Sequence, residues 1–166
     1  MKIFSVFIFF LSFEIAHQAS SDFKAELNKS LEDNPYILPI KPEEALVINL
    51  WATWCGPCVL EIPELNAVAK AYAGKGVRFV AFSNESVEAY KKFKKGRPDF
   101  KFEYEMSFGD KRTGELLKKL DKERGGQFIP MHILIDKKGN VVEVLSGSSW
   151  TNNQTIREFA EQQAGL

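Results

Sequence analysis

The stretch ALVINLWATWCGPCVLEIP, residues 45–63, decides the fold, because both cysteines of the 166-residue chain lie in it where two elements meet. Its first part, residues 45–51, is a continuous apolar run, which is typical of a strand buried on both faces. The segment after Cys55 has a helical pattern that ends near Gly74, and a second apolar run follows at residues 77–83. Strand, helix and strand at this spacing predict a βαβ unit with parallel strands and a right-handed crossover.

The rest of the chain continues the alternation of strands and helices. Strands are expected over residues 100–108, 129–135 and 141–146, and helices over residues 85–95, from Thr113 to Arg124, and from a capping box at Thr151 and Gln154. Residues 100–108, FKFEYEMSF, alternate strictly between apolar and polar side chains, which predicts a half-buried strand. One face would carry Phe100, Phe102, Tyr104, Met106 and Phe108, and the other Lys101, Glu103, Glu105 and Ser107. The turn DKKGN at residues 136–140 predicts a hairpin. The pattern indicates one α/β domain with a mixed sheet.

The N-terminal part of the chain has a different character. Lys2 is followed by an apolar run at residues 3–13, then Glu14 and small residues, which is the layout of a secretory signal peptide. The run is shorter than the ~20 residues that a membrane-spanning helix needs, although an uncleaved anchor is the alternative. We therefore expect a signal peptide or anchor at residues 1–21, a lead-in at residues 22–44 and the main domain at residues 45–166. In the lead-in, a short helix and then an extended, proline-containing segment are expected.

Composition limits the classes of partner. The chain has 22 basic and 22 acidic residues, for a formal net charge of zero, which argues against nucleic acid as a partner. The Lys-rich stretch at residues 91–97 is interpreted as a solvated helix face. A chain of this length is expected to form a single core, and we expect a monomer.

The two cysteines are poorly suited to a purely structural role. A disulfide that closes a four-residue loop gains only about 2 kcal/mol, compared with about 4.7 kcal/mol for a hundred-residue loop. A structural zinc site requires four ligands, and outside the signal region the chain offers only these cysteines and His132. The remaining interpretation is a redox-active pair.

The position of Cys55 supports a redox role. It lies where a strand ends and a helix begins, so a thiolate there would face unpaired backbone N–H groups and the positive end of the helix dipole, which lowers the pKa of a thiol. Gly56 and Pro57 suit a tight turn into the helix. Cys58 lies one turn further on, within disulfide reach. Cys55 is therefore predicted to attack substrates and Cys58 to resolve the intermediate.

The segment NLWATWCGPCVLEIP resembles the active-site segment of thioredoxin-fold proteins, and in particular the exported TlpA/ResA-type (DsbE-like) thiol–disulfide oxidoreductases. Asn49 stands where cytoplasmic thioredoxins have an Asp, and Glu61 and Pro63 match the C-x-x-E-x-P pattern. The resemblance implies a mixed central sheet flanked by helices on both faces, with an extra strand and helix between residues 100 and 124. It also implies that Glu61 raises the pKa of the Cys58 thiol or relays its proton.

A second part of the resemblance is Ile129-Pro130, which implies a cis proline beside the disulfide and backbone groups at residue 129 that pair with an extended substrate. The substrate-binding residues implied are Trp54, Gly56, Pro57, Ile129 and Pro130, and the catalytic residues are Cys55, Cys58 and Glu61. The family usually has Thr after this proline, whereas this chain has Met131 and then His132. The departure concerns the surface that contacts the substrate.

Together these features predict a protein thiol–disulfide oxidoreductase that works outside the cytoplasm, in a periplasmic or equivalent compartment, without a cofactor or metal. The resemblance implies a reductant of protein disulfides, with cytochrome c maturation as one task and a membrane-embedded thiol donor as its source of electrons. The alternative is a copper(I)-binding chaperone that uses the two cysteines and His132, because two thiolates suit Cu(I).

Overall fold

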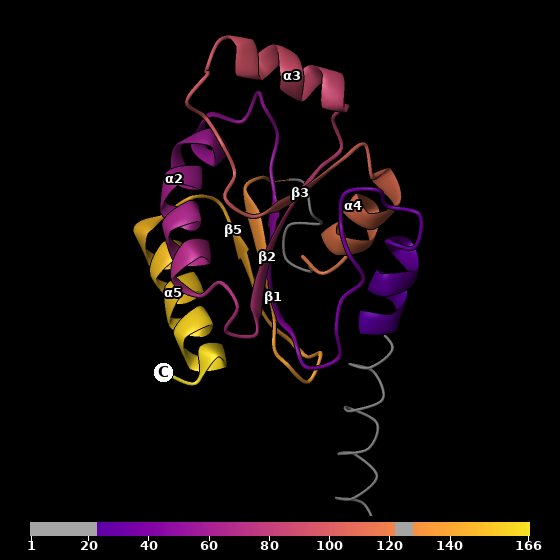
Figure 1. Cartoon of the computed structure of the whole chain (residues 1–166), viewed down its shortest axis with the longest axis vertical. Coiled ribbons are helices and arrows are strands. Elements are labelled where there is room, and N and C mark those ends of the chain that lie inside the picture. Colours follow the sequence, from indigo (N-terminus) through magenta and orange to yellow (C-terminus); the bar gives the residue numbers. More distant parts are fainter. Residues whose placement is uncertain (1–22, 122–127) are drawn as a thin grey trace, which may run out of the picture.

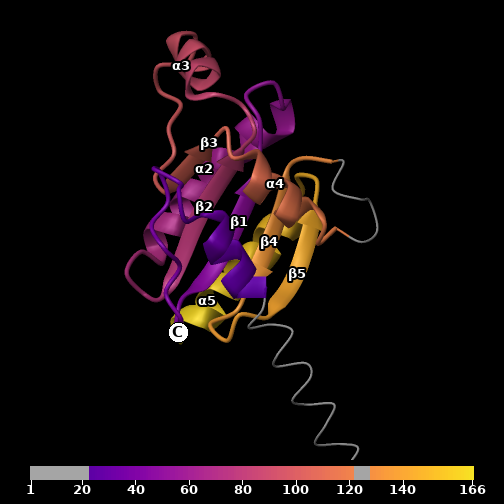
Figure 2. The same cartoon turned by 90° about the vertical axis from the view of Figure 1, so that its right-hand side faces the viewer.

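The computed structural model describes residues 23–121 and 128–166, so the segment predicted as a signal peptide or anchor lies outside the described residues. Within these ranges the chain forms a five-stranded sheet of order β3-β2-β1-β4-β5 (Figures 1 and 2). Its strands are β1 (Ala45–Leu50), β2 (Val77–Ser83), β3 (Glu105–Phe108), β4 (Met131–Ile135) and β5 (Val141–Ser146). The first three are parallel, and β4 is antiparallel to both β1 and β5. The predicted βαβ unit and hairpin are therefore confirmed.

Helices cover both faces of the sheet, as Figure 1 shows. They are α2 (Gly56–Ala71), α3 (Val87–Lys95), α4 (Lys111–Lys118), α5 (Trp150–Ala164) and a helix over residues 23–30. Helices α2 and α5 pack on one face, whereas α4 and the helix of residues 23–30 pack on the other. Helix α3 crosses the end of the molecule near the start of α2 (Figure 1). This is the α/β, thioredoxin-like arrangement predicted from the sequence.

The central strand explains the two-sided core. All six residues of β1 are buried, because alternate side chains face the helices on opposite sides. Leu46, Ile48 and Leu50 pack in one cluster, and Ala45 and Val47 pack in the other. The one polar residue of the strand, Asn49, is only 1% exposed. Its partners are described with the site below.

The strand predicted at residues 100–108 is shorter than expected. Only Glu105–Phe108 form β3, because residues 100–104 leave the sheet and direct Phe100 and Phe102 against Trp51. The side chain of Asn66 bonds the backbone of this segment, accepting from Glu103 N and donating to Lys101 O at 2.8 Å each. The strand was also predicted to be buried on one face only, whereas Ser107 on the other face is fully buried and accepts a hydrogen bond from Asn34 of the lead-in.

Two helix starts differ from the sequence predictions, by three residues for α4 and by two for α5. Helix α4 is capped by Asp110, whose carboxylate accepts from Thr113 N, so Thr113 is inside the helix. The helix ends at Lys118 rather than continuing through Asp121, and the last part of the predicted range lies outside the described residues. Helix α5 is capped by Ser149, two residues before the predicted Thr151. In each case the backbone N–H at the start of the helix donates to a side-chain oxygen that lies earlier in the sequence than the predicted cap.

None of the helices in residues 23–121 and 128–166 is long and apolar enough to cross a membrane.

Candidate functional site

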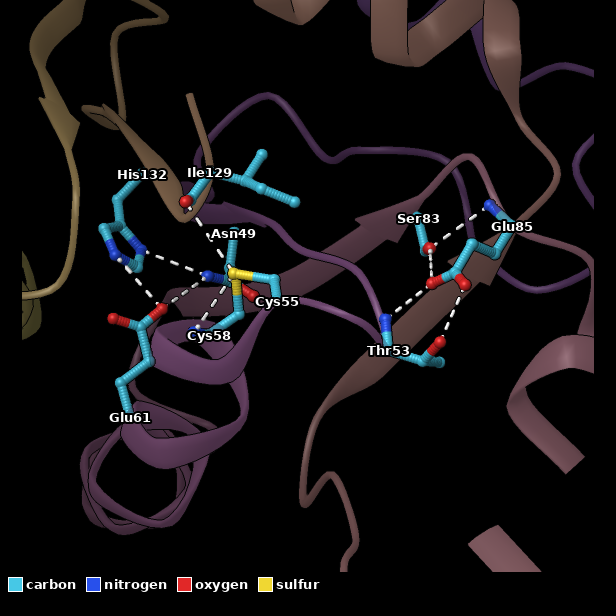
Figure 3. Close-up of a disulfide and its surroundings, with 9 residues drawn as sticks. All are labelled: Asn49, Thr53, Cys55, Cys58, Glu61, Ser83, Glu85, Ile129 and His132. Atoms are coloured by element: carbon cyan, nitrogen blue, oxygen red, sulfur yellow. Dashed lines mark hydrogen bonds and ion pairs between the residues drawn. A yellow bond between two sulfur atoms is a disulfide. The ribbon is translucent and has the colours of Figure 1, made fainter. Parts of the chain in front are cut away.

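The two cysteines form a disulfide at the start of α2, with an S–S distance of 2.00 Å (Figure 3). Cys55 is the N-cap of the helix, and the backbone N–H of Cys58 points to its Sγ atom at 3.3 Å. A sulfur in this position receives an N–H that has no partner within the helix. Cys55 is 5% exposed and Cys58 is 0% exposed, so Cys55 is the more accessible sulfur.

The local sequence explains how the pair is held. Trp51 N still bonds Phe82 O as the chain leaves β1, and Cys55 N bonds Ala52 O to close the turn into α2. Pro57 occupies the first helical turn, where a missing N–H costs little. A Cβ atom added at Gly56 would meet nothing within 4 Å, so the packing of the turn does not itself require glycine there.

The segment before β4 lies against the disulfide. The peptide bond between Ile129 and Pro130 is cis, as the resemblance implied. The carbonyl oxygen of Ile129 is 3.7 Å from Cys55 Sγ, and the carbonyl of Pro130 accepts from Gly147 N at 2.8 Å. Residues 74 positions apart in sequence therefore form one surface around the accessible sulfur (Figure 3).

Behind the disulfide, Glu61 belongs to a buried polar group that also contains Asn49 and His132 (Figure 3). Glu61 is buried, with an exposed fraction of only 3%. Asn49 Nδ2 donates to Glu61 Oε1 at 3.2 Å and lies 3.3 Å from His132 Nδ1. His132 Nε2 is 3.4 Å from the same carboxylate oxygen, a contact that is not a hydrogen bond.

A fourth buried polar group lies near this carboxylate. The phenol oxygen of Tyr104 is buried and has no hydrogen-bond partner among the described residues. Burial, and then the negative charge of Glu61, raise the pKa of Tyr104 well above its ordinary value. The phenol therefore remains protonated at neutral pH.

A cleft of about 440 Å³ lies beside the disulfide, between the turn that precedes Cys55 and helix α4. Trp54, which is 74% exposed, and Ile129 line one part of it, and Glu85, Glu115 and Lys118 supply charged groups. Glu85 also fixes the turn, because its carboxylate accepts from Thr53 N at 2.5 Å and from Thr53 Oγ1 at 2.7 Å (Figure 3).

The structure thus brings together most of the residues selected from the sequence. Cys55, Cys58, Ile129 and Pro130 meet at one end of the sheet, Trp54 lines the adjacent cleft, and Glu61 lies one helical turn behind Cys58. Glu85 and Tyr104 were not predicted as functional residues, and His132 was considered as a metal ligand and as part of the substrate-contacting surface rather than as a partner of Glu61. Asn49 and His132 are directly paired across β1 and β4, and two polar residues in otherwise apolar strands were the available signal.

The ring nitrogens of His132 face Asn49 and Glu61 rather than an open site. Among the described residues, no group of three or more His, Cys, Asp or Glu side chains is arranged to hold a metal ion.

This fold and this pair of cysteines define a thioredoxin-fold protein with a C-x-x-C disulfide at a helix N-terminus. Comparison with known proteins gives the family: the Redoxin family profile matches residues 18–161, so the chain belongs to the Redoxin family. The thiol-disulfide oxidoreductase ResA of Bacillus thuringiensis subsp. konkukian (strain 97-27) is 33% identical over 120 residues, which are 72% of this chain and 63% of that protein. The chain therefore spans less than two thirds of the length of this relative.

Solved structures agree with this assignment. A thiol:disulfide interchange protein of the thioredoxin family from Chlorobium tepidum TLS has a TM-score of 0.61 and 27% identity, covering 75% of this chain and 82% of that one. StoA from Bacillus subtilis has a TM-score of 0.54 and 22% identity, covering 74% and 86%, and it supports the fold alone. The predicted TlpA/ResA-type, DsbE-like resemblance is confirmed.

Proposed function

We propose that this protein is a thiol–disulfide oxidoreductase that reduces protein disulfides outside the cytoplasm. The observation that carries the proposal is the placement of Cys55 Sγ at the N-cap of α2, where it receives the Cys58 N–H and lies against Ile129 O. The relationship to ResA supports the reaction class. The apolar run at residues 3–13 supports export, because it has the layout of a signal peptide.

The reaction begins from the reduced pair. The Cys55 thiolate attacks one sulfur of a substrate disulfide, a mixed disulfide forms, and the other substrate sulfur leaves as a thiolate. The N-terminus of α2 stabilises the attacking thiolate, because the helix dipole and free N–H groups favour negative charge there. Cys58 is fully buried, so the substrate meets Cys55 first.

The second step releases the substrate. Cys58 loses its proton and attacks Cys55 Sγ, which closes the disulfide seen in the structure and releases the second substrate thiolate. Glu61 receives the proton, because its carboxylate is buried one turn along α2 from Cys58. Each cycle moves two electrons from the protein to the substrate.

The substrate lies along Trp54, Gly56, Pro57, Ile129 and Pro130, which surround the accessible sulfur. Trp54 offers an exposed aromatic surface, and the backbone at Ile129 suits an extended segment that pairs as an added strand. Apocytochrome c, whose haem-binding cysteines must be reduced, is a suitable client. A reductant of this kind is recharged by a membrane-embedded thiol donor.

Trapping the mixed disulfide tests the proposal directly. Cys58→Ala should stop the reaction after the first step and leave client proteins attached to Cys55, and mass spectrometry of the trapped species identifies them. Cys55→Ala is the matched control, and it should trap nothing. If the Cys58→Ala protein traps no more than the control, the proposed chemistry is wrong.

The reduction potential tests the direction of electron flow. Thioredoxin lies at about −270 mV and the oxidant DsbA at about −120 mV. We expect this protein near the thioredoxin end when it is equilibrated with glutathione buffers. A value near that of DsbA would instead identify an oxidant.

A further inference from the structure

The buried group formed by Asn49, Glu61 and His132 contains more polar chemistry than packing explains. The three residues come from β1, α2 and β4, and their exposed fractions are 1%, 3% and 0%. Within the described residues, Asn49 Oδ1, Glu61 Oε2 and His132 Nε2 have no hydrogen-bond partner. Buried polar groups are normally satisfied, so a group left partly unsatisfied beside a reactive disulfide suggests a chemical role.

The contacts of Asn49 fix the state of His132. The Nδ2 atom of Asn49 is a donor only, and it faces both Glu61 Oε1 and His132 Nδ1. Both partners must therefore be acceptors, which makes His132 a neutral imidazole with its hydrogen on Nε2. That hydrogen lies on the nitrogen that is 3.4 Å from Glu61 Oε1. Two N–H groups thus face one carboxylate oxygen.

The surroundings of Glu61 and His132 contain few other ionisable groups. Helix α2 contributes Cys58, and the segment before β3 contributes Tyr104, whose phenol responds to the charge of Glu61. Strand β5 places the apolar Leu145 opposite His132. Strand β1 contributes the neutral Asn49. No Lys or Arg among the described residues forms an ion pair with Glu61.

We propose that His132 is a positioning residue that, together with Asn49, holds Glu61 as the carboxylate that accepts the proton of Cys58. This inference rests on the proposed function. In the resolving step, the Cys58 S–H bond breaks, its proton passes to the Glu61 carboxylate, and the Cys58–Cys55 bond forms as the substrate thiolate leaves. Asn49 Nδ2 donates to Glu61 Oε1, and His132 Nε2 lies 3.4 Å from the same oxygen, so the two residues hold the carboxylate in place behind Cys58. Residue 132 is thereby part of the redox machinery although it does not touch the substrate.

The two steps can be separated with Ellman's disulfide, an aromatic probe whose released thiolate is coloured. The reduced protein should release one thiolate when Cys55 attacks and a second when Cys58 closes the ring. His132→Phe should leave the first phase unchanged and slow the second about tenfold or more at neutral pH, since positioned proton transfer contributes at least this much.

Three variants separate positioning from packing. His132→Gln keeps an N–H donor and should restore most of the second-phase rate. In a Glu61→Gln background, His132→Phe should have no further effect on the second phase. Leu134→Met changes an equally buried residue on the same face of β4 and should alter neither phase. If His132→Phe impairs folding, Asn49→Ala provides the test, and slowing of the second phase alone is again expected.

The proposal would be overturned by an unchanged second phase in His132→Phe, or by equal slowing in the Glu61→Gln background. A His132→Gln protein as slow as His132→Phe would also contradict it. Failure of the proposed function has a different signature, because the wild-type protein would then lack the fast first phase at Cys55.

Discussion

Gly56 is a site residue that the folded structure does not require to be glycine. It is the first residue of α2, its side of the helix is exposed, and an added Cβ would meet no atom within 4 Å. Its φ is not positive, so the backbone does not require glycine. The folded structure therefore gives no reason for glycine at this position, and the proposed approach of a substrate to the disulfide supplies one.

Gly56→Ala should accordingly stabilise the protein while impairing its reaction with proteins. We expect the free energy of unfolding to rise by about 0.4–1 kcal/mol, because alanine restricts the unfolded chain. Urea denaturation measures this change. Reduction of a folded protein disulfide should slow, whereas reaction with a small disulfide should not. If Gly56→Ala slowed both reactions equally, the substitution would be acting on the reactivity of the two thiols rather than on the binding of protein substrates.

Tyr104 provides a test that depends on pH. Its pKa is raised in the folded protein by burial and by Glu61, so folding is favoured while the phenol is protonated. This contribution is fully present below the unfolded pKa of about 10 and is lost as the pH rises above it. Tyr104→Phe should therefore leave stability at pH 7 unchanged or slightly higher, because the phenol oxygen has no partner among the described residues.

Denaturation of the wild-type and Tyr104→Phe proteins between about pH 8 and pH 11 checks this, since the window spans the ordinary tyrosine pKa. The difference between the two curves isolates the phenol from the lysines, which titrate in both proteins. A wild-type protein that loses no more stability than the variant at high pH would contradict the burial of an ionisable phenol.

The placement of single site residues was partly predictable. Cys55 and Cys58 could be identified because two cysteines three residues apart at a helix start can form a disulfide without any long-range contact. Ile129-Pro130 and Glu61 were identified from the family resemblance. The contact between His132 and Asn49 could not be predicted from the sequence. The two residues are 83 positions apart, and their contact depends on the register between β1 and β4. Glu85 was missed for a similar reason: its partner Thr53 is 32 positions away.

Arg78 shows how one buried charge joins several elements. Its guanidinium bonds both carboxylate oxygens of Glu105 on β3, at 2.8 and 2.6 Å, and lies 3.3 Å from Glu44. It also donates to the carbonyls of Leu38 and Pro39. Burial alone would lower the pKa of Arg78, but the hydrogen bond and charge of Glu105, and then Glu44, raise it above its ordinary value.

Arg78→Lys should therefore destabilise the protein although the charge is kept. A lysine has no planar fork, so it leaves some of these acceptors unpaired at a cost of about 1–3 kcal/mol. Urea denaturation measures the loss. Arg157→Lys is the matched control: the side chain of Arg157 is 47% exposed and its guanidinium is 3.7 Å from Glu64, so the change should be within about 0.5 kcal/mol. Similar effects at both positions would argue against a specific role for Arg78.

Element types were easier to predict than element ends. The nearly continuous apolar runs at β1 and β2 predict strands buried on both faces, and this prediction does not depend on which elements cover them. The start of α5 depends instead on which hydroxyl reaches a free N–H, and Ser149 rather than Thr151 does so. The length of the strand predicted at residues 100–108 was overestimated, because its alternating aromatic side chains can pack around Trp51 as well as on the face of a sheet.

The lead-in is part of the folded unit. Leu27, Leu31, Ile37 and Ile40 are all buried in the cluster that also contains Leu46 and Ile48 of β1. Polar contacts reinforce this packing, because Ser30 bonds Thr113 of α4 at 2.8 Å and Asn34 bonds Asp110 at 2.7 Å. From the sequence, the prolines of this segment indicated an extended conformation but not the surface that it covers. The division at residue 44 therefore separates two sequence patterns within one core.

This packing predicts where the chain can be shortened. A protein that starts at residue 23 keeps all the described contacts, whereas one that starts at residue 45 loses four buried apolar side chains. At about 1.5–3 kcal/mol for each, the loss is about 6–12 kcal/mol, comparable with the whole stability of a typical domain. The shorter protein should be unfolded at room temperature by circular dichroism. If it melts cooperatively at the temperature of the longer one, the lead-in is dispensable; Leu27→Ala, which should cost about 2–5 kcal/mol, tests the same contact in an intact chain.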